Sequence, residues 1–194
     1  HPVANNPLML AKNFPEIRQI GNVVAADLSR PTQDLKREIR ANKNGTIKKI
    51  IKTGVILRQS RSRSDTPLFQ EIYRETMDRI SAASHYYFTD RYMDDLLASP
   101  SFDASYVFAE LDGEAIAVAS IVTTEKYVQY YLSGTRNDHM RLSPMSLILR
   151  DQLFKAHAEN RSWFVLGGGL GGRQDSLTQF KLGFSKTTLP AGLI

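Results

Sequence analysis

The segment Trp163–Ser185 reads WFVLGGGLGGRQDSLTQFKLGFS. It opens with four large apolar residues, a length that suits a buried strand. Five glycines follow within residues 167–172, and glycine lets a ligand or a second backbone come close. Residues 175–182 then predict a short helix with Asp175 or Ser176 as its N-cap. The segment therefore predicts a strand, a glycine loop and a helix whose free N–H groups suit an anion or a developing oxyanion.

The glycine loop has a second interpretation, as a tight turn without a ligand. It does not match G-x-G-x-x-G followed by an acid for a ribose, and it lacks the Lys-Ser/Thr pair of a phosphate-binding P-loop. The loop alone leaves both interpretations open.

Composition predicts a packed globular protein. The chain has 194 residues, 42% hydrophobic and 23% charged, which suits one domain of ordinary size. It has no cysteine, which excludes disulfides, cysteine metal sites and a thiol nucleophile within it. No apolar run reaches the roughly 18 residues of a membrane span. The start, His-Pro-Val-Ala, resembles neither an initiator methionine nor a signal peptide, so we expect a processed or shortened chain and a cytoplasmic location.

Basic residues are concentrated in one region of the chain. Residues 36–63 carry ten lysines and arginines against one acid, Glu38. The ten are Lys36, Arg37, Arg40, Lys43, Lys48, Lys49, Lys52, Arg58, Arg61 and Arg63. Such a block favours polyanionic partners such as nucleic acid, phosphorylated ligands or anionic lipid head groups, and the alternative is a solvated surface.

The order of elements predicts an α/β (α+β) fold. Residues 1–22 read as a loop, and two basic helices are expected on either side of Asn44-Gly45. Helices are predicted at 31–42, 46–53, from Pro67, at 90–97, 143–160 and 175–182, and strands at 23–28, 55–58, 105–111, 114–124, 127–132, 163–166 and 184–189. Asp112-Gly113 marks a hairpin turn. The result is a mixed, largely antiparallel sheet flanked by helices.

The long helix at 143–160 joins the third and fourth strands of the predicted sheet core. Ligands of open sheets bind where neighbouring strands part. We therefore expect the ligand crevice between strands 127–132 and 163–166.

This order of elements resembles the GNAT fold of acyltransferases, and three sets of residues narrow the match to the Fem-type peptidoglycan aminoacyltransferases, which are similar to lipid II glycyltransferases. The first set is Asp27-Leu28-Ser29 with Ile51-Lys52-Thr53-Gly54-Val55. The second is Tyr73-Arg74-Glu75-Thr76-Met77-Asp78-Arg79 with Tyr86-Tyr87-Phe88. The third is Gly167-Gly168-Gly169, Asp175-Ser176-Leu177 and Phe180-Lys181-x-Gly183-Phe184. The resemblance covers residues 23–190, and the last set is the most specific.

The resemblance implies transfer of an amino acid from aminoacyl-tRNA to the amine of a peptidoglycan precursor. It places Phe180-Lys181 at the reaction centre and gives the lysine the role of stabilising charge on the tetrahedral intermediate. Fem-type enzymes carry two GNAT-like halves, and this chain resembles the C-terminal one. We therefore expect an N-terminal extension at 1–22 and one GNAT-like domain at 23–194, with a basic helical arm at 31–63.

The acyl donor stays open between acyl-CoA and aminoacyl-tRNA. The chain lacks the Gln/Arg-x-x-Gly-x-Gly/Ala loop by which acetyl-CoA enzymes of the GNAT fold hold pyrophosphate. Residues 134–141 read Gly-Thr-Arg-Asn-Asp-His-Met-Arg at that place. Use of CoA is therefore not supported by a motif.

The candidate site residues have distinct expected roles. Lys181 is expected to stabilise an oxyanion, with a surface lysine as the alternative, and Phe180 to pack or stack beside it. Arg136 and Arg141 suit the phosphates of a donor, with surface arginines as the alternative. Gly167, Gly168 and Gly169 are expected to supply backbone N–H groups to the donor. The histidines lack spacings such as H-E-x-x-H, so we expect no metal.

Three functions follow from these residues. The first is a Fem-like acyl- or aminoacyltransferase that forms an amide on an amine acceptor, in cell-wall precursor modification. The second is a module that binds tRNA through residues 36–63. The third is a GNAT-like scaffold without activity. The acceptor and the oligomeric state stay open.

Overall fold

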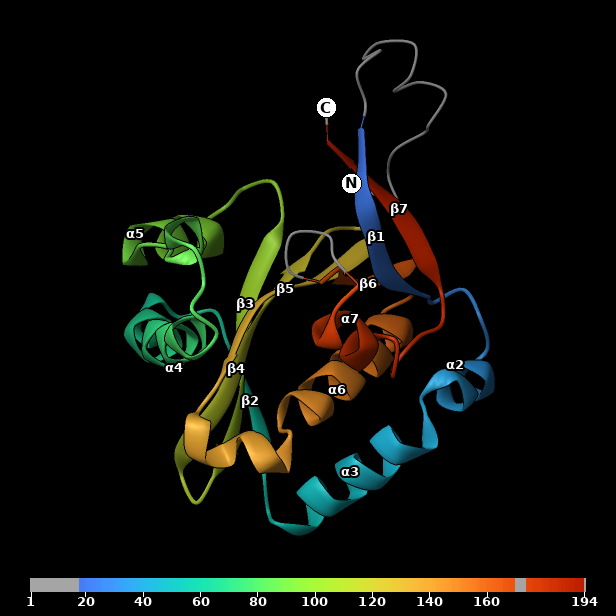
Figure 1. Cartoon of the computed structure of the whole chain (residues 1–194), viewed down its shortest axis with the longest axis horizontal. Helices are drawn as coiled ribbons and strands as arrows, with labels where there is room; N and C mark the ends of the chain where they lie inside the picture. Colours follow the sequence, from blue (N-terminus) through green and yellow to red (C-terminus); the bar gives the residue numbers. More distant parts are fainter. Residues whose placement is uncertain (1–17, 170–173, 194) are drawn as a thin grey trace.

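The computed structural model describes residues 18–169 and 174–193, and in this part the chain forms one seven-stranded sheet (Figure 1). The strand order is β2-β3-β4-β5-β6-β1-β7. Only β5 and β6 run parallel, and the other neighbours are antiparallel. The strands are β1 Arg18–Asp27, β2 Ile56–Ser60, β3 Asp103–Leu111, β4 Glu114–Thr123, β5 Tyr127–Thr135, β6 Trp163–Gly167 and β7 Thr188–Leu193. The predicted mixed, largely antiparallel sheet is confirmed.

Helices cover both faces of the sheet. Figure 1 shows α4 and α5 on one side and α2, α3, α6 and α7 on the other. The α-helices are α2 Thr32–Glu38, α3 Ala41–Lys52, α4 Thr66–Arg79, α5 Asp90–Leu97, α6 Met145–Ala158 and α7 Ser176–Lys181. Three 3-10 turns are η1 Arg63–Asp65, η2 Ser84–Tyr86 and η3 Asn137–Leu142. No described helix has the length and apolar composition needed to cross a bilayer.

The alternation of side chains along the strands divides the core in two. On β3, Val107 and Ala109 join the cluster beneath α3, α6 and α7. Tyr106 and Phe108 point the other way and join the cluster beneath α4 and α5. Both pairs are buried, which explains why the central strands read as apolar on both faces.

Several predicted elements are confirmed, and these are elements whose ends are set by hydrogen bonds or backbone angles of neighbouring residues. The helix α5 has the predicted bounds, and its N-cap is Thr89, whose side chain accepts from the backbone N–H of Tyr92. The turn between β3 and β4 holds Asp112 and Gly113 at φ 52° and 84°, as a hairpin of this sequence requires.

The predicted starts of the first and last strands are wrong. The strand β1 begins at Arg18 rather than residue 23, because residues 18–24 pair with β7. The last strand begins at Thr188 rather than Phe184, because Phe184 is buried in the core beside α7. The rest of the predicted N-terminal loop, residues 1–17, lies outside the described residues.

The break between the basic helices is also misplaced. It lies at Ile39-Arg40, not at Asn44-Gly45. Ile39 is extended and buried, and the N–H of Arg40 donates to the carbonyl of Gly183 at 2.9 Å. Gly45 lies inside α3. A long-range contact therefore ends α2 where the local sequence gave no signal.

Candidate active site

The strands β5 and β6 part at the middle of the sheet. Their parallel pairing covers only Tyr127, Val128 and Gln129 on β5. Beyond this point β5 continues with β4 alone, while β6 pairs with β1. Tyr130 is the first residue after the last pair. The divergence lies at the carboxyl end of the parallel pairing between two strands joined through α6, the place where the sequence predicts the crevice.

The side chain of Lys181 reaches this divergence. Lys181 is the last residue of α7 and only 6% exposed. Its Nζ donates to the carbonyl oxygen of Gly168 at 2.6 Å and lies 5.6 Å from the centroid of the Tyr130 ring. Gly167, at φ +81°, lies against the ammonium, since a Cβ there would stand 3.3 Å from Nζ. The strand, the glycine bend and the lysine thus meet at one point.

Burial gives Lys181 unusual acid–base behaviour. Removal from water disfavours the ammonium and lowers the pKa of Lys181 from 10.5 to about 8, although Asp175 acts in the opposite direction. The ammonium is still the main form at neutral pH, but it loses its proton far more readily than a surface lysine. The ammonium has three N–H groups, and one of them donates a hydrogen bond to the carbonyl oxygen of Gly168.

The short helix α7 begins where the sequence predicts. Asp175 is the N-cap, and its side chain accepts from the backbone N–H of Thr178 at 2.8 Å. This cap fixes the start of α7, and Lys181 at the end of the helix therefore lies beside the glycine bend.

Phe180, the neighbour of Lys181, packs against α3. Its ring makes an edge contact with Phe184, and the ammonium of Lys43 lies 3.9 Å from its centroid. Burial lowers the pKa of Lys43. Gly183 makes room for this arrangement, because a Cβ there would lie 2.9 Å from two carbons of the Lys43 side chain. The glycine of the Phe-Lys-x-Gly-Phe motif therefore allows α3 to hold α7.

Exchanging Lys43 for methionine removes the charge but keeps an apolar stem over Phe180. We expect the free energy of unfolding, measured by urea denaturation, to fall by about 1 kcal/mol, as for a partly desolvated cation–π contact. Lys48→Met, at an exposed position of the same helix, is the control. It is expected to change stability by less than about 0.5 kcal/mol. Equal losses in both variants would contradict a stabilising contact.

The described glycines of the bend differ from the prediction in one respect. Gly168 presents its carbonyl oxygen, not its N–H, to the lysine. A Cβ at Gly168 would lie 2.8 Å from the carbonyl oxygen of Asn22, so β1 packs directly on the bend. Gly169 follows without a side chain to obstruct the site. The remaining glycines, Gly171 and Gly172, lie outside the described residues.

Arg136 is not brought to Lys181. It follows β5 on the α4 side of the sheet, 2.8 Å from a carboxylate oxygen of Glu71 and 3.5 Å from one of Glu75. Its Nε also donates to the carbonyl of Ala115 at 3.0 Å. These contacts engage the guanidinium with acids of α4, and the role of Arg136 as a phosphate ligand stays a prediction. The acids of α4 that hold it could not be paired with it from sequence.

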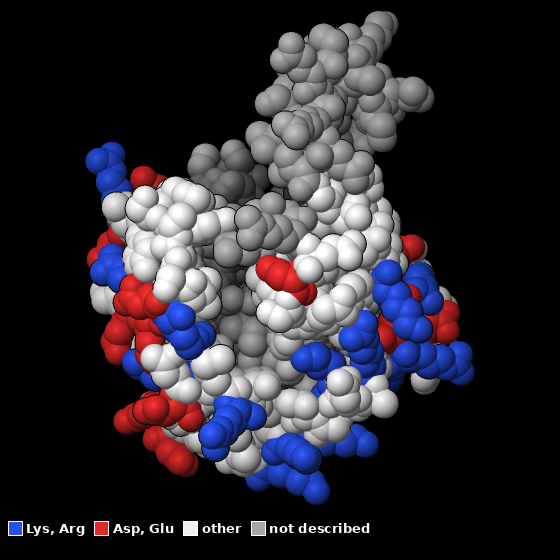
Figure 2. Space-filling model, in the orientation of Figure 1, with Lys and Arg blue, Asp and Glu red and all other residues white. Residues whose placement is uncertain are grey.

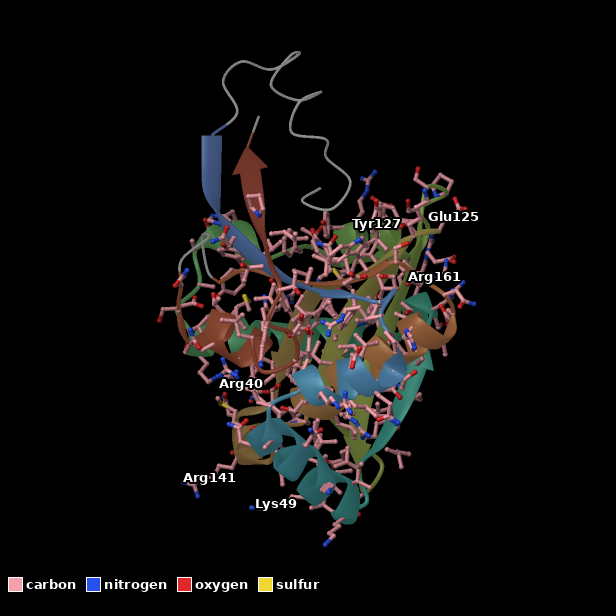
Figure 3. The ribbon with its side chains drawn as sticks, turned by 90° about the vertical axis from the view of Figure 1, so that its right-hand side faces the viewer. Arg40, Lys49, Glu125, Tyr127, Arg141 and Arg161 are labelled. Carbon is pink, nitrogen blue, oxygen red and sulfur yellow. The ribbon has the colours of Figure 1, made fainter. Side chains whose placement is uncertain are left out.

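Arg141 is exposed in η3 and points outward (Figure 3). It lies just before α6, whose N-terminus follows Ser143 in the left-handed conformation at φ 52°. Its role as a phosphate ligand remains a prediction.

No signal in the sequence indicated Lys43 at the site, and the sequence did not decide which tyrosine of β5 faces the site. Lys43 lies far from Phe180 in the chain, and no local signal joins them. For the tyrosine pair on β5 a signal existed, because neighbours on a strand face opposite ways. Tyr130 faces Lys181, and burial raises its pKa to about 12. Tyr131 faces α5 and bonds to the hydroxyl of Tyr92.

Comparisons with known proteins define the class. The acetyltransferase (GNAT) domain family matches residues 37–181, most of the chain. The chain belongs to this family, and the class is that of the acyltransferases. A search of curated proteins finds no match.

Solved structures share the fold at low identity. The C-terminal domain of a putative lysylphosphatidylglycerol synthetase from Agrobacterium fabrum matches with a TM-score of 0.69 and 17% identity, over 96% of this chain and 64% of that one. FemX matches with a TM-score of 0.70 and 12% identity, over 94% of this chain and 67% of that one. L-PGS from Bacillus licheniformis matches with a TM-score of 0.61 and 15% identity, over 87% and 52%. The chain thus spans about two thirds or less of these structures.

Proposed function

We propose that this protein transfers an aminoacyl group from an aminoacyl-tRNA to an amine, with Lys181 stabilising the oxyanion. The observation that carries the proposal is the buried ammonium of Lys181, which lies against the glycine bend where β5 and β6 part. An ammonium in a site sheltered from water stabilises developing negative charge far more than one in solution.

The reaction needs few groups from the protein. The neutral amine attacks the ester carbonyl carbon, a C–N bond forms, and the carbonyl oxygen becomes an oxyanion that accepts from the Lys181 ammonium. The C–O bond to the ribose then breaks, and the proton lost by the attacking nitrogen ends on the leaving ribose oxygen. Lys181 stays protonated throughout, so its role is electrostatic rather than that of an acid or base.

Two features favour tRNA over CoA as the donor. The pyrophosphate loop of acetyl-CoA enzymes is absent from residues 134–141. A basic surface covers α2 and α3, where Lys and Arg gather along the lower right of Figure 2, while Asp and Glu gather over α4 and α5. Its exposed members are Lys36, Arg37, Arg40, Lys48, Lys49 and Lys52. Such a surface suits a long polyanion. The names of FemX and the lysylphosphatidylglycerol synthetases agree with aminoacyl transfer.

Parallel donor assays test the proposal. The protein is incubated with alanyl-, glycyl- and lysyl-tRNA carrying labelled amino acids, or with acetyl-CoA. The acceptors are a lysine-containing cell-wall precursor peptide and, in a separate arm, phosphatidylglycerol vesicles. We expect label to move from tRNA to the peptide amine. With acetyl-CoA we expect no thiol release, which a thiol reagent detects without background because the chain has no cysteine.

Each other outcome has a definite meaning. Release of CoA thiol that depends on the acceptor would overturn the tRNA proposal and establish acetyl transfer. Labelling of the lipid instead of the peptide would move the acceptor from an amine to a hydroxyl group. Binding of tRNA without any transfer would support the tRNA-binding module instead.

A further inference from the structure

A polar cavity lies near the end of β6 that is remote from Lys181. It has a volume of about 170 Å³ and lies between β2, the start of β3, the start of β5 and the end of α6. Arg161, on its wall, precedes β6, whereas Gly168 follows β6. The five residues of β6 therefore lie between Arg161 and Gly168, a length of about 17 Å.

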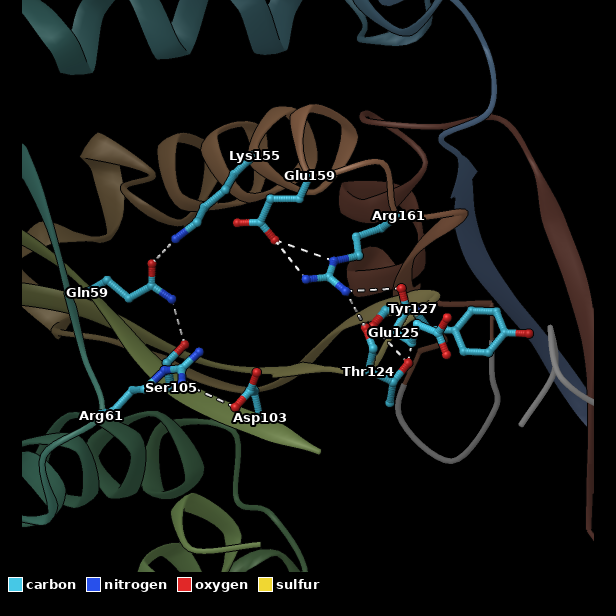
Figure 4. A network of polar contacts seen from close by, with 10 residues as sticks. All are labelled: Gln59, Arg61, Asp103, Ser105, Thr124, Glu125, Tyr127, Lys155, Glu159 and Arg161. Carbon is cyan, nitrogen blue, oxygen red and sulfur yellow. Dashed lines mark hydrogen bonds and ion pairs between the residues drawn. The ribbon is translucent and has the colours of Figure 1, made fainter. Parts of the chain in front are cut away.

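Charged groups of both signs surround this cavity (Figure 4). Arg61 donates to Asp103 Oδ1 at 3.2 Å on one side. Arg161 lies 3.3 Å from Glu159 Oε2 on the other, and it also donates to the carbonyls of Thr124 and Glu125, each at 3.0 Å. These contacts fix both arginines.

The ammonium of Lys155 is the group without a counter-charge. It donates to the amide oxygen of Gln59, whose Nε2 donates in turn to Ser105 Oγ at 2.8 Å. Within the described part of the chain no carboxylate lies within ion-pair distance of Lys155. Ser105 is only 4% exposed, so this chain of hydrogen bonds runs from the mouth of the cavity to its wall. Two protons of the ammonium are left for a further acceptor.

The carboxylates have acceptor capacity to spare. Asp103 uses Oδ1 and Glu159 uses Oε2 in the contacts above, and each has a second oxygen. Glu159 follows the last turn of α6, where the helix dipole disfavours an acid. An acid at this position gains little from the helix itself, and it adds a negative group to the cavity wall.

We propose that this cavity binds a small zwitterion, a free α-amino acid. The carboxylate of the ligand accepts from Lys155, and its ammonium donates to the second oxygen of Glu159. A cavity of this volume is below the range of about 300–1,000 Å³ that holds larger ligands, which excludes a nucleotide. The site is separate from that of Lys181, so its test does not depend on the proposed transfer.

Binding is measured directly by calorimetry and by the shift of the melting temperature, with glycine, alanine, serine and lysine as probes. N-acetylalanine lacks the ammonium, and alaninamide lacks the carboxylate. We expect at least one amino acid to bind and its two blocked forms to bind about 10-fold or more weakly, as for a lost charged hydrogen bond.

The variants Lys155→Met and Glu159→Gln are each expected to weaken binding about 10-fold or more. Both positions are exposed, so the fold is expected to persist, and an unchanged far-UV spectrum checks this. Lys52→Met, at the end of α3, is the matched control and is expected to bind like the unaltered protein. The Lys181→Met variant, which is expected to lose aminoacyl transfer, must still bind the amino acid as tightly as the unaltered protein.

Three results would overturn the proposal. The first is that none of the four amino acids binds. The second is that N-acetylalanine, acetate or phosphate binds as tightly as alanine, which would make the cavity an anion site. The third is that the Lys155 and Glu159 variants bind the amino acid as tightly as Lys52→Met does.

Discussion

Replacing Lys181 by methionine is expected to lower the rate of aminoacyl transfer by about 100- to 1,000-fold, the usual effect of removing one oxyanion donor. Methionine keeps an unbranched stem in the same space, and it leaves no buried charge. We therefore expect the melting temperature to stay the same or to rise. Label transfer from the active aminoacyl-tRNA measures the rate, and thermal denaturation measures the fold. Full activity in a folded Lys181→Met variant would refute the role of the ammonium.

The pH dependence of transfer gives an independent readout of the same group. The pKa of Lys181 is about 8, so the ammonium is lost as the pH rises through that value. The attacking amine gains reactivity as the pH rises, so we expect the rate to rise up to about pH 8 and to level off above it, where loss of the ammonium offsets that gain. Lys181→Arg keeps its charge throughout, and whatever activity it retains should continue to rise above pH 8. A rate that also levels off near pH 8 in Lys181→Arg would assign the titration to another group.

The lowered pKa also links pH to stability. The folded state gives up the Lys181 proton near pH 8, whereas an unfolded lysine keeps it to about pH 10.4. Between these values the unfolded state binds more protons, so the free energy of unfolding rises with pH. This contribution is absent below pH 8 and complete above about pH 10. Lys181→Met should lack the rise.

Replacing Gly134 by alanine is expected to destabilise the protein by about 3 kcal/mol or more, at the upper end for an overpacked core. Gly134 lies on β5 where α4 crosses the sheet. An added Cβ would stand 2.4 Å from the carbonyl oxygen of Ile72 and 2.8 Å from the Cα of Tyr73. Both obstacles are backbone, so no side chain can rotate away. The helix itself would have to move off the strand.

Gly45→Ala is the matched control for this prediction. Gly45 lies inside α3, and nothing stands within 4 Å of an added Cβ. Alanine is the better helix former, so this variant should gain about 0.5–1 kcal/mol. Urea denaturation of both proteins gives the two free energies. A Gly134→Ala variant as stable as the parent would show that α4 and β5 do not pack this closely.

The sequence predicted the elements that depend on neighbouring residues. The bounds of α5, the Asp112-Gly113 turn and the Asp175 cap all follow from hydrogen bonds or backbone angles within a few positions. The boundaries that failed depend on distant partners instead. Ile39 ends α2 because it is buried and Arg40 bonds to Gly183, and β1 extends to Arg18 because β7 lies beside it.

The sequence by itself determined the fold class and the strand–glycine–helix segment, because hydrophobic period, glycine and capping residues act locally. The resemblance to Fem-type enzymes singled out Lys181 as the residue to examine. Only the tertiary structure decided the chemistry of the charged groups. It buried Lys181 and lowered its pKa, occupied Arg136 with the acids of α4, and left Lys155 beside a cavity without a counter-charge. Burial and charge pairing depend on which segments meet in space, and residues more than a hundred positions apart, such as Lys43 and Phe180, meet only when the sheet and its helices are assembled.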